Sequence, residues 1–251
     1  MFDHWAMYQM TTMQWFLAIV CAIITGLSKA GLNAISIITV SILAWIFGSK
    51  VSTGILLPML IVGDILAILH YKREVNWQSL KKLWIWVVLG VLIGVWIGKD
   101  LDALIFKRLM ASLVIIVVVG LFWFENKPLK SVPTSTWFAG IMGASTGFTT
   151  MIGNQAGGFT NVYFLSMQLS KKYFIGTNAW LFLCVNIFKL PFHIFVWETI
   201  HYNSLAINII LLPFLVIGFY SGLYIVKRID EQRYRKVILW LTALASLFVF
   251  L

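Results

Sequence analysis

The sequence of 251 residues has few charged side chains. Only 9 residues are acidic, and Asp, Glu, Lys and Arg together make up 11% of the chain. Soluble domains are about a quarter charged, so an ordinary soluble protein is excluded, and no polar stretch is long enough to form a separate soluble domain. Hydrophobic residues reach 61% and the mean hydropathy is +0.91, which predicts a polytopic membrane protein.

Cysteines are equally scarce. Cys21 and Cys184 both lie inside apolar runs, so they are interpreted as small core residues and predict neither a disulfide framework nor a metal site. No pairing of Ser with His is evident, and Asp64 is the sole carboxylate inside an apolar run. We therefore expect no catalytic residues, no metal and no cofactor.

Positive charge is the exception, since 19 Lys and Arg give a formal net charge of +10. Nucleic acid is one partner for such a charge, but these residues flank the apolar runs. Membrane proteins place Lys and Arg in this way on their cytoplasmic side. Nucleic acid is therefore not an expected partner.

Two polar interruptions divide the apolar sequence. Residues 149–158 read Thr-Thr-Met-Ile-Gly-Asn-Gln-Ala-Gly-Gly, and residues 26–33 read Gly-Leu-Ser-Lys-Ala-Gly-Leu-Asn. The apolar runs beside them, each shorter than the about 20 residues of a spanning helix, are 13–25, 34–47, 136–148 and 159–167. Polar backbone at membrane depth is tolerated where it lines a cavity. Glycine-interrupted segments in corresponding positions of two halves point to the binding site of a transporter.

The two halves of the chain follow the same order: a broken pair, a span, a glycine-spaced span and a last span. The predicted spans are 51–70, 83–98, 109–124, 174–197, 205–226 and 237–251. Asp64 and Gly94 correspond in this order to Asn186 and Gly218. We therefore predict an all-α polytopic membrane protein of two repeats, each a broken or re-entrant helix pair plus three transmembrane helices. The first repeat covers 1–125 and the second 136–251, joined by a linker at 126–135.

The distribution of Lys and Arg predicts that the repeats are inverted. If each broken pair enters and leaves on one side, one face of the membrane holds 13 of the 19 basic residues and the other holds 4. The loops on the basic face are 71–82, 125–135, 168–173 and 227–236. This bias favours an inverted arrangement with both termini outside.

Three ionic side chains fall at membrane depth: Lys29, Asp64 and Lys189. Buried charges in a span mark functional sites, although Lys29 could instead extend to an interface. Asp64 is either a proton carrier or the ion-pair partner of a lysine. Lys189 shares an arc of about 80° on its helix with Asn178, Asn186 and His193. This polar stripe faces a cavity, or else joins helices by hydrogen bonds.

Together these features predict an anion site. Half-helices beginning after residues 33 and 158 would direct unpaired N–H groups and positive dipole ends into a cavity. Glycines allow the backbone to approach a ligand closely. The expected substrate-binding residues are Lys29, Asn33, Asn154, Gln155, Asn178, Asn186, Lys189 and His193, and the expected backbone contacts are Gly31, Gly153, Gly157 and Gly158. The ligand would be a small anion with several oxygens.

At these positions the sequence resembles the sulfite exporter TauE/SafE family of bacterial membrane transporters. The motifs are Gly-Leu-Ser-Lys-Ala-Gly at 26–31, Leu-Ile-Val-Gly-Asp-Ile at 60–65, Tyr-Lys-Arg at 71–73, Gly-Phe-Thr-Thr-Met-Ile-Gly-Asn at 147–154, Phe-Ile-Gly-Thr-Asn-Ala at 174–179 and Asn-Ile-Phe-Lys-Leu-Pro-Phe-His at 186–193. The resemblance implies a transporter of sulfite, organosulfonates or related sulfur oxyanions and organic acids in the bacterial inner membrane. We expect alternating access coupled to protons, with Asp64 as the coupling candidate. The alternative is an anion channel on the same scaffold.

Overall fold

The computed structural model describes residues 10–72, 74–102, 104–106, 108–109, 112, 116, 135–230, 233–234, 236–238 and 240. In chain order, its elements are α1 (Thr12–Lys29), the 3₁₀ turn η2 (Asn33–Ile35), α2 (Ser36–Phe47), α3 (Ser49–Tyr71), α4 (Trp77–Lys99), α6 (Thr136–Gly153), α7 (Gly157–Ser166), α8 (Lys171–Phe195) and α9 (Tyr202–Arg228). The described residues form no strand, so the all-helical prediction is confirmed for them. Almost all of the linker 126–135, and most of the predicted spans 109–124 and 237–251, lie outside these residues.

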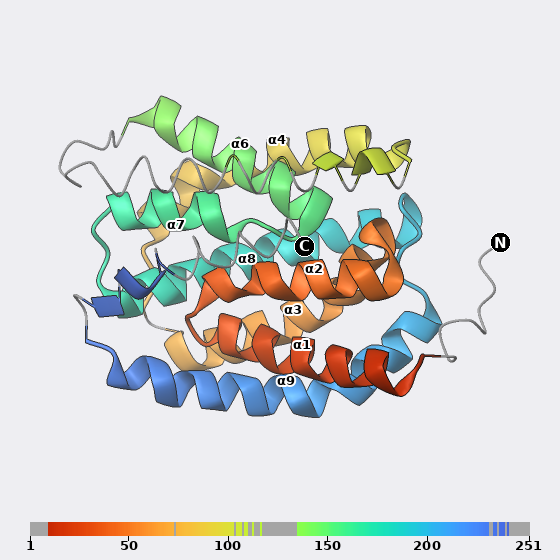
Figure 1. Cartoon of the computed structure of the whole chain (residues 1–251). Coiled ribbons are helices and arrows are strands. Elements are labelled where there is room, and N and C mark those ends of the chain that lie inside the picture. Colours follow the sequence, from red (N-terminus) through yellow and green to blue (C-terminus); the bar gives the residue numbers. More distant parts are fainter. Residues whose placement is uncertain are drawn as a thin grey trace.

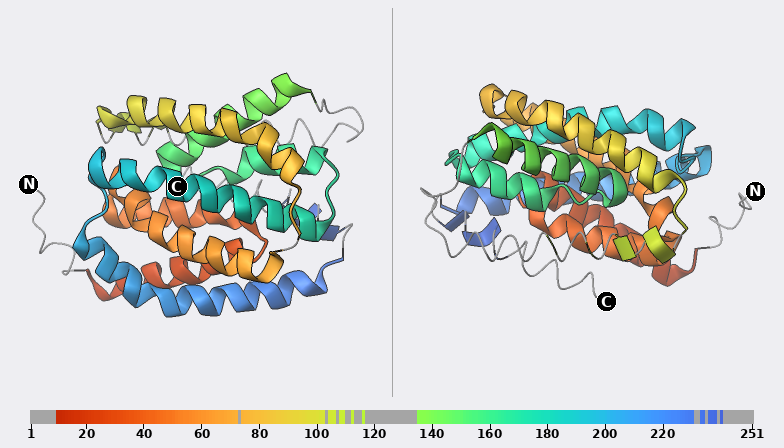
Figure 2. Two further views of the ribbon diagram at one scale, coloured as in Figure 1. Left: turned by 180° about the vertical axis from the view of Figure 1, so that it is seen from behind. Right: turned by 90° about the horizontal axis from the view of Figure 1, so that it is seen from above.

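The helices form a bundle with a common long axis. Helices α3 and α8 pack against each other in the middle, α1 pairs with α9 on one side, and α4 pairs with α6 on the other (Figures 1 and 2). Five of the described helices, α1, α3, α4, α8 and α9, are long and apolar enough to cross a membrane. These helices confirm the predicted class of multi-pass membrane protein.

The predicted spans in the described region correspond to α3, α4, α8 and α9, each of which begins earlier than its apolar run. Helix α4 shows why. Asn76 accepts a hydrogen bond through Oδ1 from the backbone N–H of Ser79 at 2.9 Å, which caps the helix inside the predicted loop 71–82. The polar residues that follow are therefore helical.

Both polar interruptions are shorter than predicted. Helix α1 continues through Gly26 to Lys29, so residues 30–32 form the first interruption, and α6 continues to Gly153, so residues 154–156 form the second. The apolar run 13–25 is consequently not too short, since α1 has 18 residues and qualifies as a span. Thr149 is helical, and its hydroxyl finds a partner within the same helix, because it donates to the carbonyl oxygen of Ser145 at 2.8 Å.

Backbone geometry explains where the helices do stop. Gly31 has φ of +134°, a conformation that side-chain-bearing residues rarely adopt. Asn154 has φ of 54° and ends α6 in the left-handed conformation, as Asn and Gly commonly do at helix C-termini. Each interruption therefore contains one residue suited to a left-handed turn.

Each broken pair is a hairpin that returns to the end of the bundle from which it started. Helix α1 begins and α2 ends at one end, whereas α6 begins and α7 ends at the opposite end (Figure 1). Lys171 Nζ joins the turns at the second end, donating to the carbonyl oxygens of Val226 and Ile229 at 3.2 and 2.6 Å. At the first end, Lys50 Nζ donates to the Lys99 carbonyl oxygen at 2.7 Å.

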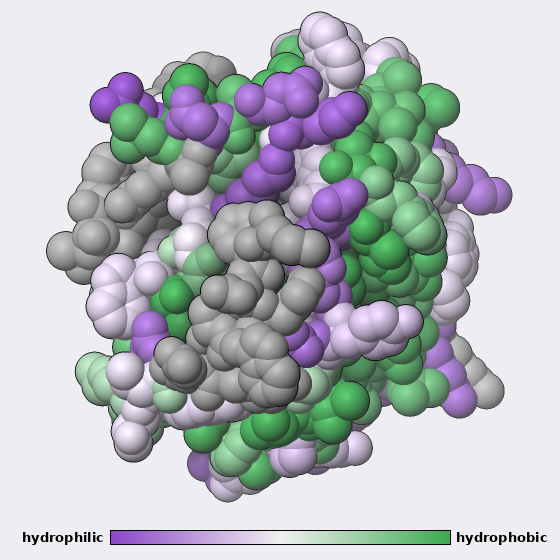
Figure 3. All heavy atoms as spheres, turned by 90° about the vertical axis from the view of Figure 1, so that its right-hand side faces the viewer, coloured by the Kyte–Doolittle hydropathy of each residue, from purple (hydrophilic) through white to green (hydrophobic). Residues whose placement is uncertain are grey.

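The first end forms a polar cap. Viewed end-on, hydrophilic residues run across it in a band, while apolar residues cover the adjoining side (Figure 3). Exposed apolar side chains such as Trp96, Ile209 and Tyr220 lie on the outer helices α4 and α9. This distribution suits a protein whose sides face lipid.

Glycines set the spacing of the two outer helix pairs. A Cβ atom on Gly26 would lie 2.1 Å from the Leu215 carbonyl oxygen on α9, and one on Gly147 would lie 2.0 Å from the Val87 carbonyl oxygen on α4. Such contacts require small residues. Gly26, predicted to belong to an interruption, instead brings α1 and α9 together.

We predict that Gly147→Ala destabilises the protein, because the added methyl would push α6 away from α4. Overpacking of this kind costs about 1–3 kcal/mol, and the expected readout is a lower thermal midpoint of the detergent-purified protein. The control is Gly140→Ala on the same helix, whose Cβ would meet the Trp86 ring at an ordinary 3.5 Å. Equal midpoints for both variants would contradict the proposed role of close packing.

Candidate functional site

The first polar contact joins the end of α1 to the middle of α3. Lys29 Nζ lies 2.6 Å from Asp64 Oδ1, and Asn186 Nδ2 on α8 donates to Asp64 Oδ2 at 2.7 Å. All three side chains are buried. Of the two roles considered for Asp64, the ion pair with a lysine is therefore present, and Lys29 points inward instead of extending to an interface.

The second polar contact joins α8 to the end of α6. Lys189 Nζ lies 2.8 Å from the Thr150 carbonyl oxygen, 3.2 Å from Thr150 Oγ1 and 2.6 Å from Asn154 Oδ1. Asn154 Nδ2 in turn donates to the Thr53 carbonyl oxygen on α3 at 3.0 Å. Lys189 is completely buried, so its position fits the predicted inward-facing stripe of α8.

The segments that follow the two interruptions contact each other. A Cβ atom on Gly157 would lie 3.4 Å from the carbonyl oxygen of Asn33, so η2 and the start of α7 approach each other inside the bundle. Helix N-termini present backbone N–H groups without intrahelical partners, together with a positive dipole end. Helix α7 begins at Gly157 instead of after Gly158 and meets the 3₁₀ turn η2, whereas α2 begins only at Ser36.

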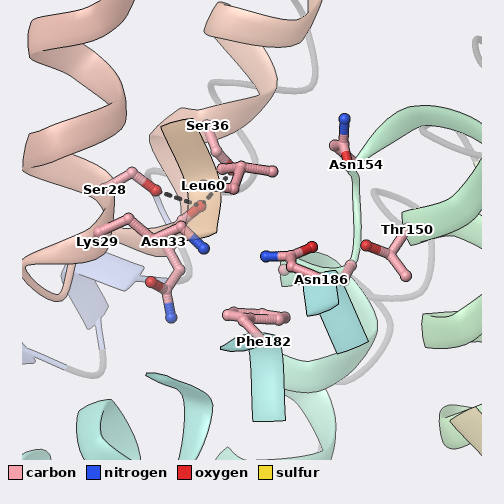
Figure 4. A pocket seen from close by; sticks show the side chains of 11 residues that line it. Ser28, Lys29, Asn33, Ser36, Leu60, Thr150, Asn154, Phe182 and Asn186 are labelled. Atoms are coloured by element: carbon pink, nitrogen blue, oxygen red, sulfur yellow. Dashed lines mark hydrogen bonds between the residues drawn. The ribbon is translucent and has the colours of Figure 1, made fainter. Parts of the chain in front are cut away.

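A small cavity of about 20 Å³ lies between the interruptions. Space of about 10–15 Å³ accommodates one water, so the cavity is tight. Figure 4 shows Ser28, Lys29 and Asn33, beside the first interruption, on one side of the cavity. Thr150 and Asn154, at the end of α6, lie on the other side, and Phe182 and Asn186 of α8 lie between them. Its lining consists of Ser28, Lys29, Asn33, Ser36, Leu60, Thr150, Asn154, Ala156, Gly157, Phe182 and Asn186.

Two donors at this cavity retain hydrogen-bonding capacity. Asn33 Nδ2 is buried and has no hydrogen-bond partner within the described residues. The Lys29 ammonium has three N–H donors, of which Asp64 accepts one, and its Nζ also lies 4.9 Å from the centre of the Phe182 ring. A buried donor without a partner is costly, and a ligand with oxygen acceptors would remove that cost.

The predicted site residues divide into those that line the cavity and those that lie around it. Lys29, Asn33, Asn154, Asn186 and Gly157 line the cavity. The others are placed around it: Asp64 pairs with Lys29, and Lys189 binds Asn154. Residues that belong to the surrounding packing are Gln155, Asn178, His193, Gly31, Gly153 and Gly158.

Asn178, His193 and Gly31 illustrate how residues of the surrounding packing differ from those that line the cavity. Asn178 Nδ2 donates to the Phe174 carbonyl oxygen of its own helix at 3.0 Å. His193 Nδ1 lies 2.8 Å from Thr199 Oγ1, in the turn between α8 and α9. The Gly31 carbonyl oxygen accepts from the Tyr234 hydroxyl at 2.5 Å, and its α-carbon faces Ile175.

Sequence reasoning missed four lining residues with a clear chemical character. Ser28 and Ser36 lie next to the first interruption and both donate to the Asn33 carbonyl oxygen, at 3.4 and 2.8 Å. The other two missed lining residues are Thr150 and Phe182. The signal for Phe182 was available, since it lies four residues from both Asn178 and Asn186 and so shares the polar stripe's face of α8.

The apolar helices and their buried polar cluster define a multi-pass membrane protein with a polar interior. A comparison with protein families matches residues 17–249 to the family described as "Sulfite exporter TauE/SafE". The chain belongs to this family, which implies a membrane transporter of sulfur anions. The comparisons with curated proteins and with solved structures found no match.

We predict that the Lys29–Asp64 pair is strongly coupled. Removing one partner of a buried pair costs about 3–5 kcal/mol, because the other charge is left unpaired. Lys29→Met and Asp64→Leu should each lower the free energy of unfolding by about that amount, and the double variant by clearly less than the sum. Reversible unfolding in mixed detergent micelles measures all three, and additive effects would contradict the coupling.

Proposed function

We propose that the protein is a secondary transporter that moves a small sulfur oxyanion or organosulfonate across the bacterial cytoplasmic membrane by alternating access. The observation that supports this proposal most directly is the buried cavity between the two interruptions. It combines a lysine ammonium, an unpartnered amide donor and the N-terminus of α7, and each of these groups favours an anion.

Lys29 and Asn33 would bind the anion directly. Lys189 would act from behind the cavity wall, because its ammonium lies 2.6 Å from Asn154 Oδ1 and Asn154 lines the cavity. Asn154 and Asn186 each donate their amide hydrogens to protein oxygens. They would therefore position Lys189 and Asp64 and shape the cavity.

Asp64 would couple the transport of doubly charged anions to protons. The Asp64 carboxylate is paired directly with the Lys29 ammonium. A proton on Asp64 would break this ion pair and allow Lys29 to bind the anion. Loss of the proton would restore the ion pair and favour release of the anion. This cycle makes Asp64 the proton-coupling residue and H⁺ the coupling ion.

Alternating access would follow from two inverted repeats. Four pairs of helices run in opposite directions along the bundle, α1 and α6, α2 and α7, α3 and α8, and α4 and α9 (Figure 1). Each half also supplies the glycine-spaced partner of the other half's broken helix, since α1 packs on α9 and α6 on α4. Inverted repeats around a midplane site are the usual basis of alternating access.

The basic turns at the end where α3 meets α4 would face the cytoplasm, following the positive-inside bias. Both chain termini would then lie outside. The tight cavity favours a carrier that closes around its substrate over an open anion channel. The oxyanion would bind in a state in which the interruptions have moved apart.

We predict that Asn33→Ala weakens anion binding. A hydrogen bond to a charged group is worth about 1.5–3 kcal/mol, so the dissociation constant for methanesulfonate should rise roughly tenfold or more, measured by calorimetry on purified protein. The matched control is Asn208→Ala, a buried amide on α9 without a partner among the described residues and away from the cavity. Equal effects of both substitutions would contradict the assignment of Asn33.

A flux experiment separates the carrier from the channel. We expect proteoliposomes to accumulate labelled methanesulfonate by exchange against unlabelled anion inside, because a carrier returns with substrate bound. Lys29→Met should abolish this exchange, whereas Lys50→Met, at the polar cap, should retain it. Rapid conductive flux without exchange would indicate the channel.

A further inference from the structure

Three ionic side chains meet in the interior, and their charges do not cancel. Among the described residues, the buried Lys, Arg, Asp and Glu side chains are Lys29, Asp64 and Lys189. Lys29 and Asp64 neutralise each other at 2.6 Å. Lys189 has no carboxylate within salt-bridge distance in the described part of the chain, so two lysines face one carboxylate.

The contacts of Lys189 suit a charged ammonium. An ammonium has three donors and no acceptor, and Lys189 Nζ has three oxygens around it: the Thr150 carbonyl oxygen, Thr150 Oγ1 and Asn154 Oδ1. These oxygens are dipoles without net charge. They solvate the ammonium but leave its positive charge uncompensated.

The remaining ionisable groups near Asp64 do not change the charge balance among Lys29, Asp64 and Lys189. Besides Lys29 on α1, helix α8 brings Lys189 and Cys184 within electrostatic range of Asp64, and His193 within range of Lys189. His193 is bound to Thr199 and Cys184 is a free thiol, so neither supplies a carboxylate that would balance Lys189. Helices α2, α6 and α9 place no Asp, Glu, Lys, Arg or His among the buried described residues.

An uncompensated charge in a low-dielectric interior costs several kcal/mol. The cavity lies where an anion would remove this cost, because Lys29 lines it and Asn154 and Thr150 separate it from Lys189. One negative charge suffices when Asp64 is ionised. A second negative charge on the ligand would make the interior negative unless the Asp64 carboxylate were protonated.

From this balance we infer that the site binds singly charged oxyanions without taking up a proton, and doubly charged oxyanions together with one proton, which resides on the Asp64 carboxylate. The proton comes from solvent and forms an O–H bond at Asp64, and no other bond is made or broken. The Lys29 ammonium, released from Asp64, then balances the second charge of the dianion. This inference rests on the proposed anion site and specifies the charge of its substrate.

Methanesulfonate and thiosulfate provide a matched pair of probes. Both present three oxygens on sulfur, with a methyl group in one and a sulfur atom in the other, and they carry one and two negative charges near neutral pH. Calorimetric titration of the purified protein in buffers of different ionisation enthalpy counts the protons taken up on binding. We expect zero protons for methanesulfonate and one for thiosulfate.

The dissociation constant for thiosulfate should accordingly rise about tenfold per pH unit between pH 6 and 8, because binding takes up one proton. The constant for methanesulfonate should stay level. Asp64→Asn should remove the pH dependence for thiosulfate, since the site then holds two positive charges, while the exposed control Asp100→Asn should preserve it. The wild-type proton counts decide the question even if Asp64→Asn does not fold.

The outcomes distinguish this inference from the proposed function. If both anions bind with equal proton uptake, the inferred charge balance is wrong, but the proposal of an anion transporter still stands. One proton taken up with methanesulfonate also overturns the charge balance, because Lys189 would then be neutral in the empty site. Failure of both anions to bind, while the protein remains folded, argues against the proposed function itself.

Discussion

The ion pair between Lys29 and Asp64 is the contact on which the interior depends. A charged side chain inside a membrane bundle is tolerated only when it is paired or solvated by the protein. Pairing fixes Lys29 at the end of α1 against the middle of α3, and Asn186 holds the second carboxylate oxygen from α8. Three helices are thereby tied together at the first interruption, where the backbone has lost its own helical hydrogen bonds.

Close packing of the outer helices makes this arrangement possible. Gly26 allows α1 to contact α9 through the backbone, and Gly147 allows α6 to contact α4. Each broken helix therefore has a firm partner, while its interruption faces α3 and α8 in the centre. This division suits a transporter, because the outer pairs supply rigid support and the interruptions supply polar groups.

Much of this structure follows from the sequence. Hydropathy and length predicted the long helices α3, α4, α8 and α9, and the three buried charges pointed to the interior site. The bounds of the interruptions were wrong, because glycine and threonine inside an apolar run can signal either a break or close packing, and only the neighbouring helix decides. Gly26 meets α9, and the Thr149 hydroxyl bonds within its own helix.

The site itself was predicted less completely for a related reason. A polar stripe shows which face of α8 is inward, but it does not show which of its members reach the cavity. Asn178 and His193 find partners near their own helix ends, whereas Asn186 and Phe182 reach the centre. Ser28 and Ser36 were not predicted to line the site, because a single serine beside an interruption is also common at ordinary helix ends.

The two polar contacts at the interruptions are alike in geometry and different in charge. Lys29 and Asp64 are separated by 35 residues, and so are Asn154 and Lys189. In each case, the end of a broken helix is joined to the long helix that follows the hairpin. In the proposed duplication, one contact is an ion pair and the other joins an ammonium to a neutral amide. Two ion pairs would leave the interior neutral and give an anion no electrostatic reason to enter. Because Asn154 is a neutral amide, it does not compensate a charge on Lys189, and this excess positive charge is what the proposed anion site requires.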